Sequence, residues 1–99
     1  MSAELTVIYW RDIPAQVNAV DGTVVARVQL SERFQQTIDA AAMQAGLVDA
    51  DAYLEQWRQE SRPCGPDLQA QAAAEADRLE SEHGPDALAR LAQAGGVRT

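Results

Sequence analysis

The chain of 99 residues is long enough for one domain, and its composition excludes several classes of partner. It carries 15 acidic and 8 basic residues, so its net charge is −7, and every basic residue is an arginine. Nucleic acid and anionic membrane surfaces are therefore not expected partners, because both require a basic surface. We also expect no signal peptide and no membrane span. The lone cysteine cannot form an internal disulfide, and these features together predict a cytoplasmic protein.

The first 30 residues predict a three-stranded antiparallel meander. Residues 5–10 are β-branched and aromatic, as strands prefer. The segment Asp12-Ile13-Pro14 turns the chain into a second strand over 15–20, because the proline pushes the preceding residue toward an extended conformation. Asp21-Gly22 is a two-residue hairpin signal. Residues 23–30 then alternate as a third strand.

The next segment predicts two helices packed on this sheet. Ser31 caps the first helix, in which apolar residues recur at helical spacing. Gly46 ends it, because glycine readily takes the left-handed conformation. In the second helix, Tyr53, Leu54 and Trp57 form an apolar face. The predicted fold class is therefore α+β: a three-stranded meander packed by two helices.

The rest of the chain predicts a joint and a helical tail. Two prolines and a glycine within residues 63–66 cannot continue a helix. Residues 67–99 read as two further helices, a hairpin-like tail that buries mainly alanine, which stabilises little. We therefore divide the chain into a compact α+β domain at 1–62, a Pro/Gly joint at 63–66 and an Ala-rich tail at 67–99. We expect the tail to be the least stable part.

Patterns for catalysis and metal binding are weak. The acids of residues 49–60 occupy some positions of a calcium loop, but Leu54 stands where the sharp turn needs glycine. His83 lies near two glutamates, and one histidine does not make a zinc site. Cys64 has no histidine near it in sequence to activate it. We expect no cofactor, no metal and no catalytic residue; an enzyme that uses Asp12 with an arginine is the weaker alternative.

The unusual feature is the Arg11-Asp12 pair, which follows Trp10 at the end of the first strand. In a purely structural reading, Asp12 caps the turn and Arg11 is solvated. In a binding reading, arginine and aromatic residues form a hot spot, and the planar guanidinium recognises carboxylates or phosphates. The candidate binding residues are Trp10, Arg11, Asp12, Pro14, Gln16, Arg33, Tyr53, Trp57 and Arg58.

The same segments carry a family resemblance. The run Tyr9-Trp10-Arg11-Asp12-Ile13-Pro14-Ala15-Gln16-Val17, together with Arg33-Phe34 and residues 51–58, resembles the small bacterial "virulence factor" domain family over about residues 4–60. The resemblance implies the compact domain, but it implies no reaction, because no catalytic residues are established for the family. It also implies a setting in folate and corrinoid one-carbon chemistry, because stand-alone members sit among such genes.

These observations predict a non-catalytic accessory or adaptor protein that docks on a larger protein, in one-carbon or metallocofactor metabolism. The alternative is a small-ligand module with an arginine–aromatic pocket for an anionic metabolite. A concave pocket with two arginines and an aromatic ring would favour the ligand, whereas an exposed aromatic patch would favour a protein. Both readings require residues 10–12 and 53–58 to lie side by side. We expect Arg11 and Asp12 to point to a shared polar edge, with Arg33 or Arg58 as the pairing partner.

Overall fold

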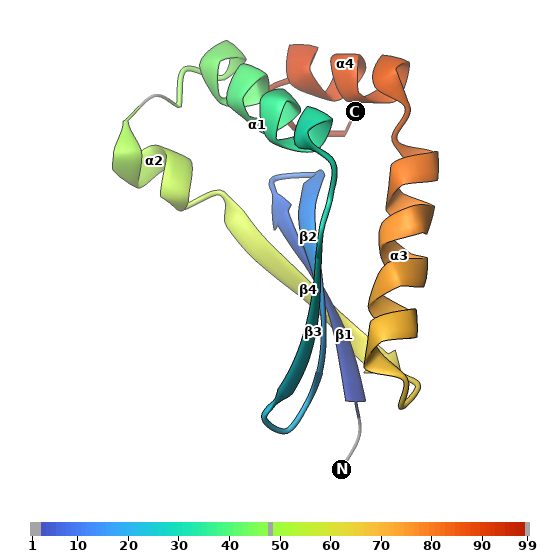
Figure 1. The fold of residues 1–99 in the computed structure, drawn as a ribbon. Coiled ribbons are helices and arrows are strands. Elements are labelled where there is room, and N and C mark those ends of the chain that lie inside the picture. Colours follow the sequence, from blue (N-terminus) through green and yellow to red (C-terminus); the bar gives the residue numbers. More distant parts are fainter. Residues whose placement is uncertain (1–2, 48, 99) are drawn as a thin grey trace.

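The computed structural model describes residues 3–47 and 49–98, which form one antiparallel sheet and four helices (Figure 1). The strands are β1 (Ala3–Trp10), β2 (Ile13–Asp21), β3 (Val24–Gln29) and β4 (Trp57–Cys64). The helices are α1 (Glu32–Gln44), α2 (Ala50–Leu54), α3 (Leu68–Glu82) and α4 (Pro85–Gln93). The strand order in the sheet is β3-β2-β1-β4.

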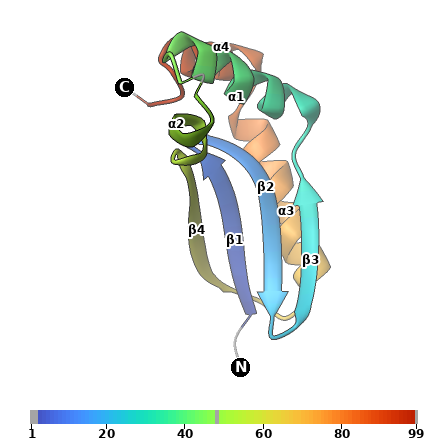
Figure 2. The same cartoon turned by 90° about the vertical axis from the view of Figure 1, so that its left-hand side faces the viewer.

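The helices cover one face and one end of this sheet. Helix α3 runs along one face and packs against β2 and β3, while α4 packs against α1 at the end of the sheet. Figure 2 shows the opposite face, on which no helix of the described chain covers the lower part of the strands. None of the helices in residues 3–47 and 49–98 is long and apolar enough to cross a bilayer.

The core forms where the strands, α1, α3 and α4 meet. Alternate residues of β1 and β2 point toward α3 because side chains alternate between the two faces of a strand. Apolar residues of the three helices complete the same buried cluster. Its large members include Leu5, Val7, Trp10, Ile13, Val17, Phe34, Ile38, Leu79, Leu88 and Leu91. Trp10 and Ile13 are fully buried, so both anchor the turn between β1 and β2 as expected.

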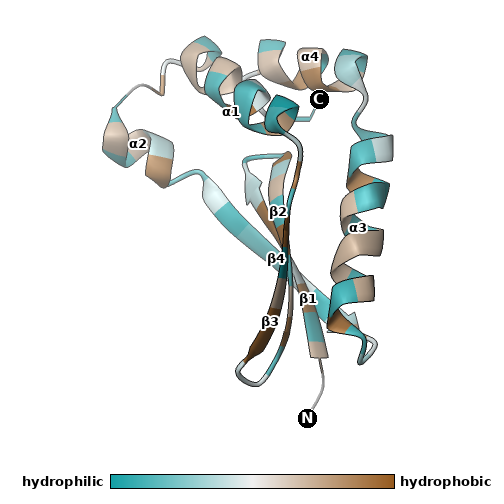
Figure 3. Ribbon diagram, viewed as in Figure 1, coloured by the Kyte–Doolittle hydropathy of each residue, from teal (hydrophilic) through white to brown (hydrophobic). Residues whose placement is uncertain are grey.

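The meander and the first helix are confirmed, but the prediction of three strands is wrong. Helix α2 ends at Leu54, and Trp57 and Arg58 lie on β4 rather than on a second helix. β4 pairs with β1 from Trp10↔Trp57 to Ala3↔Cys64. Figure 3 shows why the sequence hides this strand: it is hydrophilic over most of its length. An edge strand tolerates charges and proline, because one side of its backbone pairs with no other strand.

The carboxyl-terminal helices pack differently from a hairpin-like tail. Helix α3 lies on the sheet and α4 lies on α1, and both contribute to the buried cluster that β1 and β2 share. Residues 63–64 of the predicted joint belong to β4. The alanines of α3, of which Ala72 and Ala76 are buried, present a small-residue face to the sheet. The packing of α3 and α4 brings the last described residues, 95–98, next to the turn between β1 and β2.

Candidate functional site

The connection between β1 and β2 has an unusual backbone conformation at Arg11. Its φ of 54° lies in the left-handed region, and no other residue except glycine in the described ranges has a positive φ. Hydrogen bonds hold it there: the Arg11 amide donates to the carbonyl of Gln56, its Nε donates to the Gln56 side chain, and its Nη1 donates to the carbonyl of Gly95, each at 3.0 Å. The guanidinium also lies 5.5 Å from the ring centroid of Trp10.

Asp12 joins this turn to two distant segments. One carboxylate oxygen pairs with Nη2 of Arg58 at 3.1 Å, and the other accepts a hydrogen bond from the backbone amide of Arg98 at 2.7 Å. The Asp12 amide donates to the carbonyl of Gly96 at 2.8 Å. The turn is therefore fastened to both β4 and the end of the described chain.

Arg58 is fixed in place although 40% of its side chain is exposed. Its Nε donates to the carbonyl of Arg11 at 2.8 Å, its guanidinium stacks 4.4 Å from the ring centroid of Tyr9, and it pairs with Glu60 as well as with Asp12. Burial opposes its charge, but the hydrogen bonds to the two carboxylates outweigh this and raise the pKa of Arg58. The result is a rigid cation at the protein surface.

The aromatic side chains form a stack beside these arginines. The Trp10 indole donates to the carbonyl of Tyr53 at 2.9 Å, and the two ring centroids lie 5.5 Å apart. Tyr53 then meets Trp57 edge to face, at 6.2 Å and 82°. Trp10 is fully buried, whereas Tyr53 and Trp57 are half-buried. We define Arg11, Asp12, Tyr53, Trp57 and Arg58 as the Arg–aromatic corner.

The other predicted site residues lie elsewhere or are buried. Pro14 and Trp10 support the corner from the core. Gln16 lies on β2 and donates to the side chain of Asn18 at 2.7 Å. Arg33 is not at the corner: it pairs with Glu80 at 2.8 Å and stacks on the ring that follows it in α1. The partner of Asp12 is Arg58, and the alternative pairing with Arg33 is wrong.

Sequence reasoning missed the residues that hold the corner from the end of the chain. Gly95 and Gly96 read as the stop signal of a helix, yet their carbonyls bind the turn, with Gly95 84 positions beyond Arg11. His83 is a buried core residue whose Nδ1 donates to the carbonyl of Leu79 at 2.8 Å, and its Nε2 accepts from Arg98 at 2.9 Å. These roles arise from contacts that no local pattern indicates.

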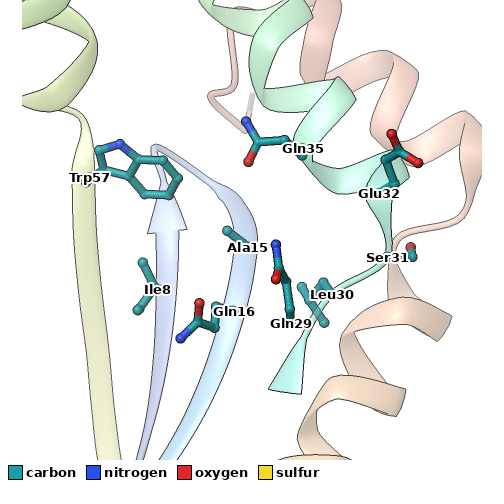
Figure 4. A pocket seen from close by; sticks show the side chains of 9 residues that line it. All are labelled: Ile8, Ala15, Gln16, Gln29, Leu30, Ser31, Glu32, Gln35 and Trp57. Atoms are coloured by element: carbon teal, nitrogen blue, oxygen red, sulfur yellow. The ribbon is translucent and has the colours of Figure 1, made fainter. Parts of the chain in front are cut away.

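Cavities near the corner have a different chemistry from the predicted anion pocket. Trp57 lines a groove of about 670 Å³ together with polar and aliphatic side chains, and no arginine lines it. Figure 4 shows these side chains. A smaller cavity of about 250 Å³ is lined by Arg90, Arg98 and His83, and it has no Trp, Tyr or Phe. Neither of these two cavities combines two arginines with Trp, Tyr or Phe. A third cavity, of about 150 Å³, is lined by Tyr9, Arg62 and Arg78, but Glu75 pairs with both of these arginines. Within the described residues, no group of three or more His, Cys, Asp or Glu side chains could hold a metal ion.

These features define a small α+β domain in which a short charged turn is fastened to an edge strand and to the carboxyl-terminal segment. The chain belongs to the virulence factor family, whose model matches residues 8–92. The match includes the Arg–aromatic corner and extends through α3 into α4, beyond the residues 4–60 that carried the resemblance. A search of curated proteins and a search of solved structures each found no match.

Proposed function

We propose that this protein is a non-catalytic accessory protein that docks on a larger protein through the Arg–aromatic corner. The observation that carries the proposal is the fixed, half-exposed Arg58 beside the aromatic stack. A side chain that is already ordered loses little conformational entropy on binding, so its contacts contribute more to affinity. Arginine, tyrosine and tryptophan are also the residues enriched at binding hot spots.

Both arginines of the corner keep hydrogen-bonding capacity for a partner. A guanidinium has five N–H donors. Within the described residues, Arg58 directs Nε, Nη1 and Nη2 to one acceptor each, and the Arg11 side chain uses Nε and Nη1. The remaining donors suit carboxylates or carbonyls on a protein surface. Leu54, 60% exposed on the adjoining helix α2, adds an apolar contact.

The anionic-metabolite alternative has less support. The groove lined by the half-buried Trp57 lacks arginine, and the cavity with Arg90 and Arg98 has no Trp, Tyr or Phe. The cavity with Arg62, Arg78 and Tyr9 has its two arginines already paired with Glu75. An anion of metabolite size is bound best where several charged donors converge in a concave site. The corner instead presents its cations at the surface, as a protein interface does.

The test is capture of a partner by matched pairs of variants. Tagged protein is cross-linked in lysate, and a protein recovered by the wild type is purified and its Kd measured. Arg58→Ala and Leu54→Asp should each weaken binding about tenfold or more, as loss of a hot-spot residue does. The controls are Arg27→Ala and Val24→Asp, which change similarly exposed residues on β3. Equal binding by all four variants, with circular dichroism showing that each is folded, would refute docking at the corner.

The setting implied by the family resemblance decides which purified partners are tried first. Enzymes of one-carbon and metallocofactor metabolism from the same organism are the direct candidates. Binding to one of them should be lost with Arg58→Ala and kept with Arg27→Ala. If a partner binds the wild type and Arg58→Ala equally, the interface lies elsewhere on the molecule and the proposed site is wrong.

A further inference from the structure

The groove between the open face of the sheet and α1 has a chemistry that the docking proposal does not use. We infer that it is a binding site for an uncharged sugar ring, either a free sugar or the end of a glycan. Its volume of about 670 Å³ lies within the range of small-ligand sites. The inference rests on the groove's charge, its hydrogen-bonding groups and its single indole. The groove shares this indole, Trp57, with the Arg–aromatic corner, but the inference does not depend on the corner's proposed partner.

Five elements build the groove. Ile8 of β1 and Gln16 of β2 form its floor, and Trp57 of β4 forms one wall (Figure 4). Gln29 closes the opposite side, and Gln35 reaches in from α1. At Ala15 the register between β1 and β2 shifts, which is a β-bulge, and its carbonyl accepts a hydrogen bond from the amide of Leu30 at 3.1 Å. This contact ties the start of α1 to the sheet, so the amides are held on rigid elements.

The charge of the groove argues against an anionic ligand. No arginine or histidine lines it, and the chain contains no lysine. Its ionisable lining residue is Glu32, an exposed carboxylate at the start of α1. A phosphate or carboxylate on the ligand would meet this negative charge without a charged donor to offset it. An uncharged ligand avoids that cost.

The glutamine side chains of the groove keep carbonyl oxygens that can accept hydrogen bonds from a ligand. A glutamine amide offers two N–H donors and one carbonyl acceptor. Gln16 donates from Nε2 to Asn18 at 2.7 Å, and Gln35 donates from Nε2 to Asp39 at 3.1 Å. Those partners of Gln16 and Gln35 orient the amides and leave both carbonyl oxygens without a donor in the described residues. Together with Glu32, these oxygens suit a ligand that is rich in O–H donors.

The indole supplies the apolar part of the site. Trp57 is half-buried and is held by its edge-to-face contact with Tyr53. An indole packs well against a flat apolar surface while its surroundings remain hydrated. A pyranose ring combines one face of C–H groups with hydroxyls around its rim, so it can meet the indole and the amides at once. Its remaining hydroxyls can stay in water, which suits a groove that opens to solvent.

The open face of the sheet extends the groove along the strands. Beyond Ile8, the side chains of Thr6 and Ser61 face each other at 2.9 Å, and Asn18 pairs with Thr6 in the register of β1 and β2. In the register of the sheet, these polar, uncharged residues lie farther from α1 than Ile8 does. A second sugar unit would find further hydrogen-bonding groups there. A glycan end should therefore bind more tightly than a free monosaccharide.

The test is a titration followed by the side-chain amide signals in nitrogen–proton correlation spectra. Glucose, galactose, mannose and N-acetylglucosamine are added up to about 50 mM, since single sugars commonly bind near the millimolar range of affinity. At least one of them should shift the amide signals of Gln16, Gln29 and Gln35 and the indole signal of Trp57 in a saturable manner. Glucuronate, the anionic match of glucose, should bind at least about threefold more weakly. Absence of saturable shifts with all four sugars would overturn the inference.

Matched variants locate the site. Gln35→Ala should weaken binding about three- to tenfold, the cost of one lost neutral hydrogen bond. Gln36→Ala is the control, because Gln36 is also exposed on α1 but lines a different surface with Arg33 and Pro85. Equal weakening by both variants would overturn the assignment to this groove.

Two further series of ligands distinguish a free sugar from a glycan, and a sugar ring from a heterocycle. Di- and trisaccharides of the best sugar should bind more tightly than the monosaccharide if the source is a glycan, and equally if it is a free sugar. Adenosine and uridine present flat uncharged rings with few hydroxyls on the ring itself. Binding of these nucleosides without binding of any sugar would replace the sugar ring by a heterocycle. The binding is measured without the docking partner, so its failure leaves the docking proposal standing, and the reverse holds too.

Discussion

Replacing Gly96 with alanine should destabilise the protein much more than the same change at Gly46. Both glycines have a positive φ, 89° and 74°, so alanine at either position costs about 1–2 kcal/mol in backbone strain. At Gly46 an added Cβ would meet nothing within 4 Å. At Gly96 it would lie 3.0 Å from Cζ3 and 3.3 Å from Cε3 of Trp10, which is fully buried and cannot move aside freely.

The clash adds the cost of an overpacked core, about 1–3 kcal/mol. We therefore expect Gly96→Ala to lower the free energy of unfolding by about 2–5 kcal/mol and Gly46→Ala by about 1–2 kcal/mol. A domain of this size has a total stability of about 5–15 kcal/mol, so the difference between the variants is large. Each kcal/mol of this difference in unfolding free energy lowers the melting temperature by about 4–8 °C.

Urea unfolding followed by tryptophan fluorescence and by circular dichroism measures both variants. The three proteins should share one slope, and the midpoint should fall in Gly46→Ala and fall further in Gly96→Ala. If Gly96→Ala loses no more stability than Gly46→Ala, the carboxyl-terminal segment does not pack on Trp10 in solution. The contacts of Gly95 and Arg98 with the turn would then lose their support as well.

Three other changes probe the remaining contacts. Glu75→Gln removes the buried carboxylate that binds two arginines, and it should cost about 1–3 kcal/mol at neutral pH. Burial opposes the charge of Glu75, but its hydrogen bonds to the arginines outweigh burial and lower its pKa. The stability that Glu75 contributes is therefore complete above the usual carboxyl pKa and is lost as the pH falls below it. Urea unfolding from pH 7 to pH 3 should show that Glu75→Gln loses less stability in acid than the wild type does. Leu79→Ala should cost about 2–5 kcal/mol, since this residue of α3 is 2% exposed, and a cost below about 1 kcal/mol in thermal unfolding would support a loosely packed tail. Trp10→Phe deletes the indole hydrogen bond to Tyr53, and hydrogen exchange should show faster opening of α2 while the exchange of β2 changes less.

Local chemistry made the meander and the first helix predictable. The β-branched run of β1 and the Asp21-Gly22 turn are signals that act within a few residues, and the structure has both. β4 was not predictable because its side chains carry no alternating apolar pattern. Its place is set by β1, which would otherwise be an unpaired edge, and an edge partner needs backbone groups rather than apolar side chains.

The Arg–aromatic corner was predictable in part, because some of its signals also act within a few residues. Arg11 and Asp12 are conspicuous because opposite charges interrupt an apolar segment, and Arg58 lies near aromatic residues in sequence. The contacts with Gly96 and Arg98 depend on how α3 and α4 return the chain to the sheet. That path follows from tertiary packing of alanine-rich faces, and composition suggested only that those faces stabilise little.

The hydrogen bonds between the turn after β1 and residues 95–98 can form only late in synthesis of the chain. Asp12 leaves the ribosome early, but its partner amide at Arg98 lies 86 positions later. Until that segment emerges, the left-handed conformation of Arg11 lacks the hydrogen bond to the carbonyl of Gly95. A nascent chain can therefore pair its first three strands while this end of the sheet stays open, and it closes only when translation of the domain is nearly complete.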